Sequence, residues 1–191
     1  MIKIQKRFIW SFLGLIVSLI LIITWFYPYS FFSINKSYTH KPDPVIVDQY
    51  VEDLNDFKES YELNINKESA TLTANYTQYI LPMFEQDWLI YKDSVNMGKR
   101  ELDNMLFEVK ENKRTLMHLL VEEDYTKDQR RDVASSLENL QFLEELIIDI
   151  KTEKTSSRST LNTQFHNLHV HYISTFRMYV SFYKQYHGLD N

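Results

Sequence analysis

A stretch without any charged side chain, Phe8 to Ile34, follows a short basic start and constrains this chain more than any other feature. Its most apolar part is the 20-residue segment 8–27. At about 1.5 Å per residue, a helix of this length measures roughly 30 Å, which matches the hydrocarbon core of a bilayer. The sequence therefore predicts a transmembrane helix at residues 8–27.

Two other interpretations of this segment compete with a membrane anchor. A cleaved signal peptide has an apolar region of about 7–15 residues and a small-residue cleavage site. Here the apolar run is longer, and it ends in the bulky residues Trp25, Phe26 and Tyr27. A buried core helix is seldom this long without a charge. The residues therefore favour an uncleaved signal-anchor helix.

The basic residues predict the orientation of this helix. Lys3, Lys6 and Arg7 precede it, and the next basic residue is Lys36. Under the positive-inside rule, residues 1–7 form a cytoplasmic tail and the rest of the chain lies outside the cytoplasm. We therefore expect a single-pass protein of the cell membrane.

Aromatic and small residues add detail to the predicted span. Trp10, Trp25 and Tyr27 lie near its two ends, as in the aromatic belts found at headgroup depth. Gly14 and Ser18 form a small-x-x-x-small pair, which can bring two membrane helices together. The predicted partners are thus the lipid bilayer, a membrane or envelope protein, and a second copy of the chain.

The charge of the remaining chain limits its partners. Residues 36–191 hold 18 basic and 26 acidic side chains, a net charge of −8. Nucleic-acid binding requires clustered Lys and Arg, so we exclude it as the main role. The same charge argues against a domain that lies tightly on an anionic lipid surface.

The composition predicts an all-α fold. The chain has no cysteine, which excludes disulfides, thiolate metal sites and thiol nucleophiles. It has only three Gly and four Pro, too few for the turns of a strand-rich domain. We therefore expect a juxtamembrane linker at residues 28–43 and an antiparallel bundle of four to five long helices at residues 44–189.

Local signals place the ends of these helices. Asp43 and Pro44 suit the N-cap and the first turn of the first helix. Thr126 with Gln129 fits a capping box. Breaks in the helical pattern are expected near residues 123–127 and 155–157. Near residues 66–69 and 98, the sequence does not decide whether a helix breaks or continues.

Two further segments carry expectations about packing. Phe84, Trp88, Tyr91 and Val95 recur at helical spacing, so a helix is expected between Pro82 and residue 98. Residues 140–150 are apolar on most sides, which predicts that they form the centre of the core.

Histidines make the last helix chemically distinct. Residues 155–189 contain no acidic side chain but four of the six histidines. This pattern favours charge complementarity with the acidic stretch 101–153, and a pH-sensitive contact is the alternative. His166 and His169 lie about 60° apart on a helix and are the candidate metal ligands. They would need carboxylates from another helix, so we expect no metal or cofactor.

Aromatic residues near the C-terminus exceed what one core stripe requires. Phe182 lies about 60° from the centre of the stripe, next to Tyr183 and Tyr186. An exposed remainder there would form a partner-binding patch. We therefore predict partner contacts at Phe182, Tyr183 and Tyr186.

Together these features predict a membrane-anchored, extracytoplasmic interaction or accessory protein of a cell-envelope assembly, without enzymatic activity. One alternative is a helical sensory or ligand-binding domain that signals through a membrane partner. Another is a metal-dependent enzyme built on His166 and His169.

Overall fold

The computed structural model describes residues 2–66 and 71–189, with side chains from residue 9 onward. This part of the chain is mostly helical, with seven helices and one two-stranded antiparallel sheet. The elements in chain order are α1 (Ile2–Phe26), β1 (Ser37–His40), α2 (Pro44–Ile65), α3 (Leu72–Phe84), α4 (Asp87–Ile90), β2 (Val95–Gly98), α5 (Lys99–Glu122), α6 (Lys127–Thr152) and α7 (Arg158–His187).

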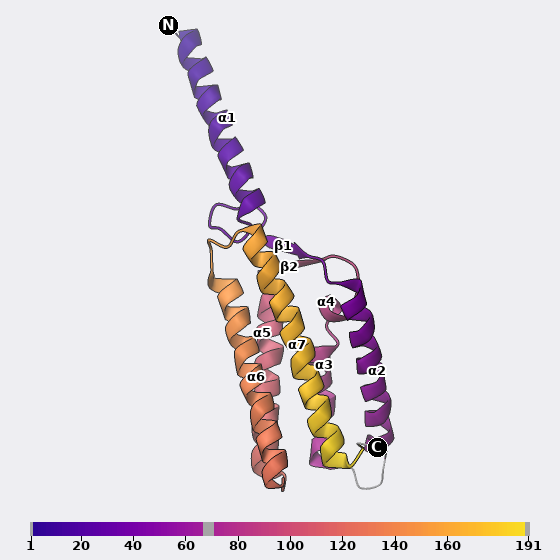
Figure 1. The fold of residues 1–191 in the computed structure, drawn as a ribbon. Coiled ribbons are helices and arrows are strands. Elements are labelled where there is room, and N and C mark those ends of the chain that lie inside the picture. The colour runs from indigo at the N-terminus through magenta and orange to yellow at the C-terminus, as the bar shows by residue number, and fades with distance from the viewer. Residues whose placement is uncertain (1, 67–70, 190–191) are drawn as a thin grey trace.

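One helix stands apart from the others. α1 projects from one end of the molecule, and the other long helices lie side by side beyond it (Figure 1). α5, α6 and α7 follow one another in alternating directions, and the β1–β2 ribbon lies near the base of α1 (Figure 1). We call residues 27–189 the helical domain, and we call its end next to α1 the α1 end.

The predicted helix starts are confirmed, and so are the breaks expected near residues 123–127 and 155–157. Asp43 Oδ1 accepts a hydrogen bond from the Val45 amide at 2.9 Å, which caps α2. The Thr126 amide donates to Gln129 Oε1 at 2.9 Å, as a capping box requires. At the two positions that the sequence left open, α2 ends at Ile65 before α3 begins at Leu72, and α5 begins at Lys99; residues 67–70 lie outside the described residues.

The expected helix between Pro82 and residue 98 is wrong. α3 ends at Phe84, a single turn of helix follows as α4, and the chain then extends into β2. β2 pairs with β1 in antiparallel register, with Tyr38 opposite Met97 and His40 opposite Val95. The local spacing suits a helix, but this pairing with a distant segment decides the structure.

The segment 28–43 also differs from the expected linker. It contains β1, and Tyr29, Tyr38 and His40 are buried against the helical domain. The Tyr29 hydroxyl donates a hydrogen bond to the Met97 carbonyl oxygen at 2.7 Å, in a buried position. The packed domain therefore begins well before residue 44.

The core is centred on α7 rather than on residues 140–150. α7 buries eleven residues and α6 buries six, although α6 is almost as long. Phe142 of α6 is largely exposed, and Phe176 of α7 packs edge-on against the rings of Tyr50, Phe57 and Phe84. Aromatic side chains from α2 and α3 thus close over α7, which explains its burial.

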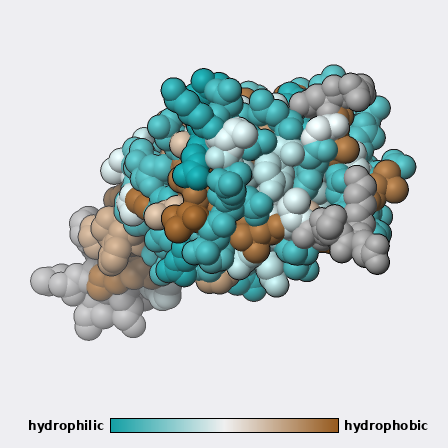
Figure 2. All heavy atoms as spheres, turned by 90° about the horizontal axis from the view of Figure 1, so that it is seen from below, coloured by the Kyte–Doolittle hydropathy of each residue, from teal (hydrophilic) through white to brown (hydrophobic). Residues whose placement is uncertain are grey.

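The end of the helical domain opposite α1 has a mainly hydrophilic surface. Figure 2 looks at that end and shows isolated hydrophobic side chains among hydrophilic ones. Scattered exposed apolar side chains of this kind are normal for a folded domain in water. Most of the large exposed apolar side chains belong instead to α1 and the residues that follow it.

Candidate functional site at the α1 end

The side chains of α1 have almost no packing partners. Residues Ile9–Phe26 are long and apolar enough to cross a membrane, and none of them is buried. The core helix of a water-soluble domain would bury its apolar side chains, so that interpretation does not fit α1. Trp10, Trp25 and Tyr27 are exposed, as residues of an aromatic belt would be. The side chains of Lys3, Lys6 and Arg7 lie outside the described residues.

The base of α1 is joined to the helical domain by specific contacts. The Arg158 side chain, at the start of α7, donates a hydrogen bond from Nε to the Trp25 carbonyl oxygen. Its guanidinium also lies 4.7 Å from the centre of the Trp25 ring. The Ile34 amide donates to Thr24 Oγ1 at 3.1 Å, so the chain after α1 folds back along the helix.

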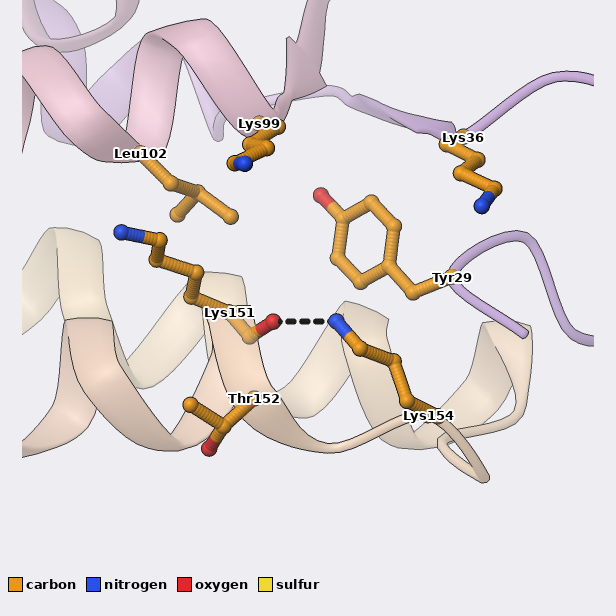
Figure 3. Close-up of a pocket in the computed structure, with 7 residues that line it drawn as sticks. All are labelled: Tyr29, Lys36, Lys99, Leu102, Lys151, Thr152 and Lys154. Atoms are coloured by element: carbon orange, nitrogen blue, oxygen red, sulfur yellow. Dashed lines mark hydrogen bonds between the residues drawn. The ribbon is translucent and has the colours of Figure 1, made fainter. Parts of the chain in front are cut away.

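A pocket lined by lysines opens beside this junction. Its volume is about 470 Å³, and Figure 3 shows its lining residues around the Tyr29 ring. These residues come from the turn after α1, from the start of α5 and from the end of α6. They are Tyr29, Lys36, Lys99, Leu102, Lys151, Thr152 and Lys154. We call this site the basic pocket.

The four lysines of the basic pocket differ in their partners. Lys151 forms an ion pair with Asp103, whose pKa is lowered mainly by this hydrogen bond. Lys154 Nζ donates to the Lys151 carbonyl oxygen at 2.6 Å, at the end of α6. Within the described part of the chain, Lys36 and Lys99 form no salt bridge. The pocket lining thus holds four lysines and no acidic residue, and the neighbouring Asp103 interacts with both Lys151 and Lys99.

Tyr29 forms a fixed wall of this pocket. Burial raises its pKa above the usual range for a phenol, and the nearby Glu101 carboxylate adds to the effect. Its hydroxyl remains protonated and bonded to the Met97 carbonyl oxygen. Tyr29 thus supplies an aromatic surface beside the lysines, and its hydroxyl group stays uncharged.

The two candidate metal ligands lie in different environments. His169 is buried, and its ring lies 5.9 Å from that of His40 and 5.5 Å from that of Trp88. His166 is exposed on the surface of α7. Across residues 2–66 and 71–189, no group of three or more His, Asp or Glu side chains is placed to hold a metal ion.

Burial changes the acid–base behaviour of the histidine pair. The pKa of His40 is lowered to about 4, first by burial and then by the neighbouring His169 and His166. Burial likewise lowers the pKa of His169 to about 4, with a contribution from His166. Both rings are therefore neutral at pH 7. This pair joins β1 to α7, a contact that the sequence did not predict.

The expected exposed aromatic patch near the C-terminus is wrong. Phe182 and Tyr183 are fully buried, and Tyr186 is half-buried. The Tyr183 ring lies 5.1 Å from that of Phe57, and the Phe182 ring lies 5.5 Å from that of Tyr125. These extra aromatic residues fill space between α7, α2 and the α5–α6 connection, so they are core residues.

The basic pocket is the candidate site that sequence reasoning missed. Its lysines lie at positions 36, 99, 151 and 154, and they belong to three separate regions of the chain. Only Lys151 and Lys154 are close in sequence, near an expected helix end. The fold alone brings the other two beside them.

Comparison with known proteins assigns no function to this arrangement. The chain matches no protein-family model, no curated protein and no solved structure.

Proposed function

We propose that the chain is a single-pass cell-membrane protein that holds an antiparallel helical bundle outside the cytoplasm, as an interaction or accessory subunit of an envelope assembly. The observation that carries this proposal is the unburied apolar surface of α1, Ile9–Phe26, on a chain whose other helices pack together. Anchoring confines the bundle to a thin layer at the membrane, which raises its effective concentration for a membrane-bound partner.

The junction below α1 supports a firm attachment rather than a loose tether. Arg158 contacts Trp25, and Tyr29 is buried against β2. A partner would therefore meet the bundle in a defined position relative to the membrane. The bundle would act without catalysis, by presenting its surface there.

The proposed orientation can be tested with single cysteines, because the natural chain has none. Asp124→Cys is exposed at the end opposite α1, and Gln5→Cys lies in the predicted cytoplasmic tail. In intact cells, we expect a membrane-impermeant maleimide to label the cysteine at position 124. It should label the cysteine at position 5 only after permeabilisation. The reverse labelling pattern would invert the proposed topology.

Truncations separate the anchor from the bundle. A fragment that begins at Tyr27 keeps Tyr29 and Ser33, whereas one that begins at Lys36 loses both buried residues. We expect the longer fragment to be soluble and folded. The shorter fragment should be less stable by about 2–4 kcal/mol, because a large buried side chain is lost. Urea denaturation followed by Trp fluorescence measures this difference, and equal stability would show that Tyr29 does not belong to the core.

The same fragment tests the interaction role. Chemical crosslinking of native membranes that contain the full chain should capture one abundant membrane or envelope protein. The soluble fragment from Tyr27 should capture the same protein if the bundle carries the contact. Capture by the full chain alone would place the contact in the membrane helix, and no specific capture by either would contradict the proposal.

The sensory alternative has one observation in its favour. The basic pocket lies beside the base of α1, so a ligand bound there would act directly on the contacts that hold the helix. A ligand-dependent change in the crosslinking of α1 to a membrane partner would favour this function.

A further inference from the structure

Two of the four lysines of the basic pocket, Lys36 and Lys99, form no salt bridge within the described residues. Lys151 and Lys154 lie at the end of α6, where positive charge stabilises the helix dipole and Lys154 binds a carbonyl oxygen. These two lysines thus have an internal explanation. Lys36 instead lies over the Phe31 ring, and Lys99 interacts with the Asp103 carboxylate only at a longer range than an ion pair.

Lys99 lies where positive charge is unfavourable to the helix. It is the first residue of α5, and Arg100 is the second. The start of a helix carries a partial positive charge and favours acidic side chains or bound anions. The only acidic residue in this turn, Glu101, accepts a hydrogen bond from the Gly98 amide at 3.0 Å and pairs with Arg100. Asp103 also interacts with Lys99, but it already pairs with Lys151, so an anion in the pocket would add to the compensation of Lys99.

Apolar residues beside the pocket indicate where this anion comes from. Phe31, Phe32 and Ile34 follow α1 and are 79%, 65% and 72% exposed. Lys36 Nζ lies 5.7 Å from the centre of the Phe31 ring. Exposed rings next to lysines, at the end of an apolar helix, match the chemistry of the layer between lipid tails and headgroups.

We propose that the basic pocket binds the phosphate group of an anionic lipid headgroup. Lys36 and Lys99 pair with the phosphate, Lys151 and Lys154 add positive charge, and the Tyr29 ring lies beneath the headgroup. This inference rests on the proposed membrane anchoring of α1. The net negative charge of residues 36–191 argues against a domain that lies tightly on an anionic lipid surface. A basic site at the one end that meets the membrane is compatible with that charge.

The test uses the full chain in nanodiscs that contain equal amounts of phosphatidylglycerol and phosphatidylcholine. Native mass spectrometry of the released chain identifies the retained lipid by its mass. We expect the natural chain to retain phosphatidylglycerol preferentially. The variant Lys36→Gln/Lys99→Gln should reduce this preference about tenfold. Both side chains are exposed, so the variant folds.

Two further variants test whether the pocket itself is responsible. Lys127→Gln/Lys184→Gln makes the same change in net charge at the opposite end, and it should leave the preference unchanged. Asp103→Asn removes the partner of Lys151 and should increase the preference. Equal retention of both lipids by the natural chain would overturn the proposal. So would an equal loss in the two double variants.

A second measurement, with a soluble ligand, distinguishes a lipid phosphate from a free phosphate. Glycerol phosphate is titrated against the full chain in a nonionic detergent without phosphate. Binding that depends on Lys36 and Lys99, without retention of phosphatidylglycerol, would overturn the lipid as the source. A chain that does not enter the nanodisc would refute the membrane anchoring instead, so the two failures are distinct.

Discussion

Lowering the pH from 7 to 5 is expected to destabilise the helical domain by about 3 kcal/mol, through the buried pair His40 and His169. In the fold, burial lowers the pKa of each ring to about 4. In the unfolded chain, an imidazole has a pKa of about 6.5. The two rings lie 5.9 Å apart, so protons bind to them as a coupled pair.

The sign of this effect follows from proton binding. Between pH 6.5 and 4 the unfolded chain binds more protons at these rings than the folded chain does, so acid favours unfolding. Well above pH 6.5 both states have neutral rings, so these two rings no longer make the stability depend on pH. Asp103 and Glu144 have lowered pKa values, caused first by hydrogen bonds from lysines, so their contribution is lost only at lower pH.

Urea denaturation of the full chain in detergent, at several pH values from 7 to 5, measures the predicted slope. His40→Gln/His169→Gln keeps polar side chains of similar size but removes both titrating rings, so its stability should change little over this range. His166→Gln, on the exposed face of α7, is the matched control and should keep the slope. An unchanged slope in the double variant would assign the pH dependence to other groups.

Sequence reasoning succeeded where the determining interactions are local. The cap at Asp43 and the capping box at Thr126 involve residues two or three positions apart, and both are present. The breaks before α6 and α7 follow from similar short-range signals. The uncharged run also identifies α1, because length and polarity alone determine whether a helix can span a bilayer.

Long-range contacts account for the structural features that the sequence did not predict. β1 and β2 pair across more than fifty residues, and neither segment has a strand pattern strong enough to predict it. The helical spacing of Phe84, Trp88 and Val95 was misleading, because Trp88 and Val95 serve two different elements. The basic pocket has the same origin, since Lys36 and Lys99 meet only after this ribbon has formed.

The burial of the aromatic residues of α7 could be predicted only with knowledge of the elements that pack around this helix. The number of rings near Tyr183 suggested an exposed remainder, but α2 and the α5–α6 connection supply rings that cover them. Periodicity gives the direction of a side chain on its own helix. It does not show how many other helices pack around that helix.

Replacing Phe57 by Ala is expected to cost about 3–5 kcal/mol of unfolding free energy, the typical cost of deleting a buried aromatic ring. Phe57 is fully buried and joins α2 to α7. Its ring packs edge-on against Phe176, Tyr179 and Tyr183, at centroid distances of 5.8, 6.1 and 5.1 Å. Such edge-to-face pairs add about 0.5–1.5 kcal/mol each to the burial of apolar area.

The matched control is Phe107→Ala on α5, where the ring is 60% exposed, and it should change the stability by less than about 0.5 kcal/mol. Phe57→Leu should recover part of the loss, because it keeps apolar volume but not the ring geometry. Urea denaturation of the full chain at pH 7 measures all three variants. If Phe57→Ala were as stable as Phe107→Ala, α2 would not pack on α7. Tyr183 would then be free to bind a partner, as its sequence context first indicated.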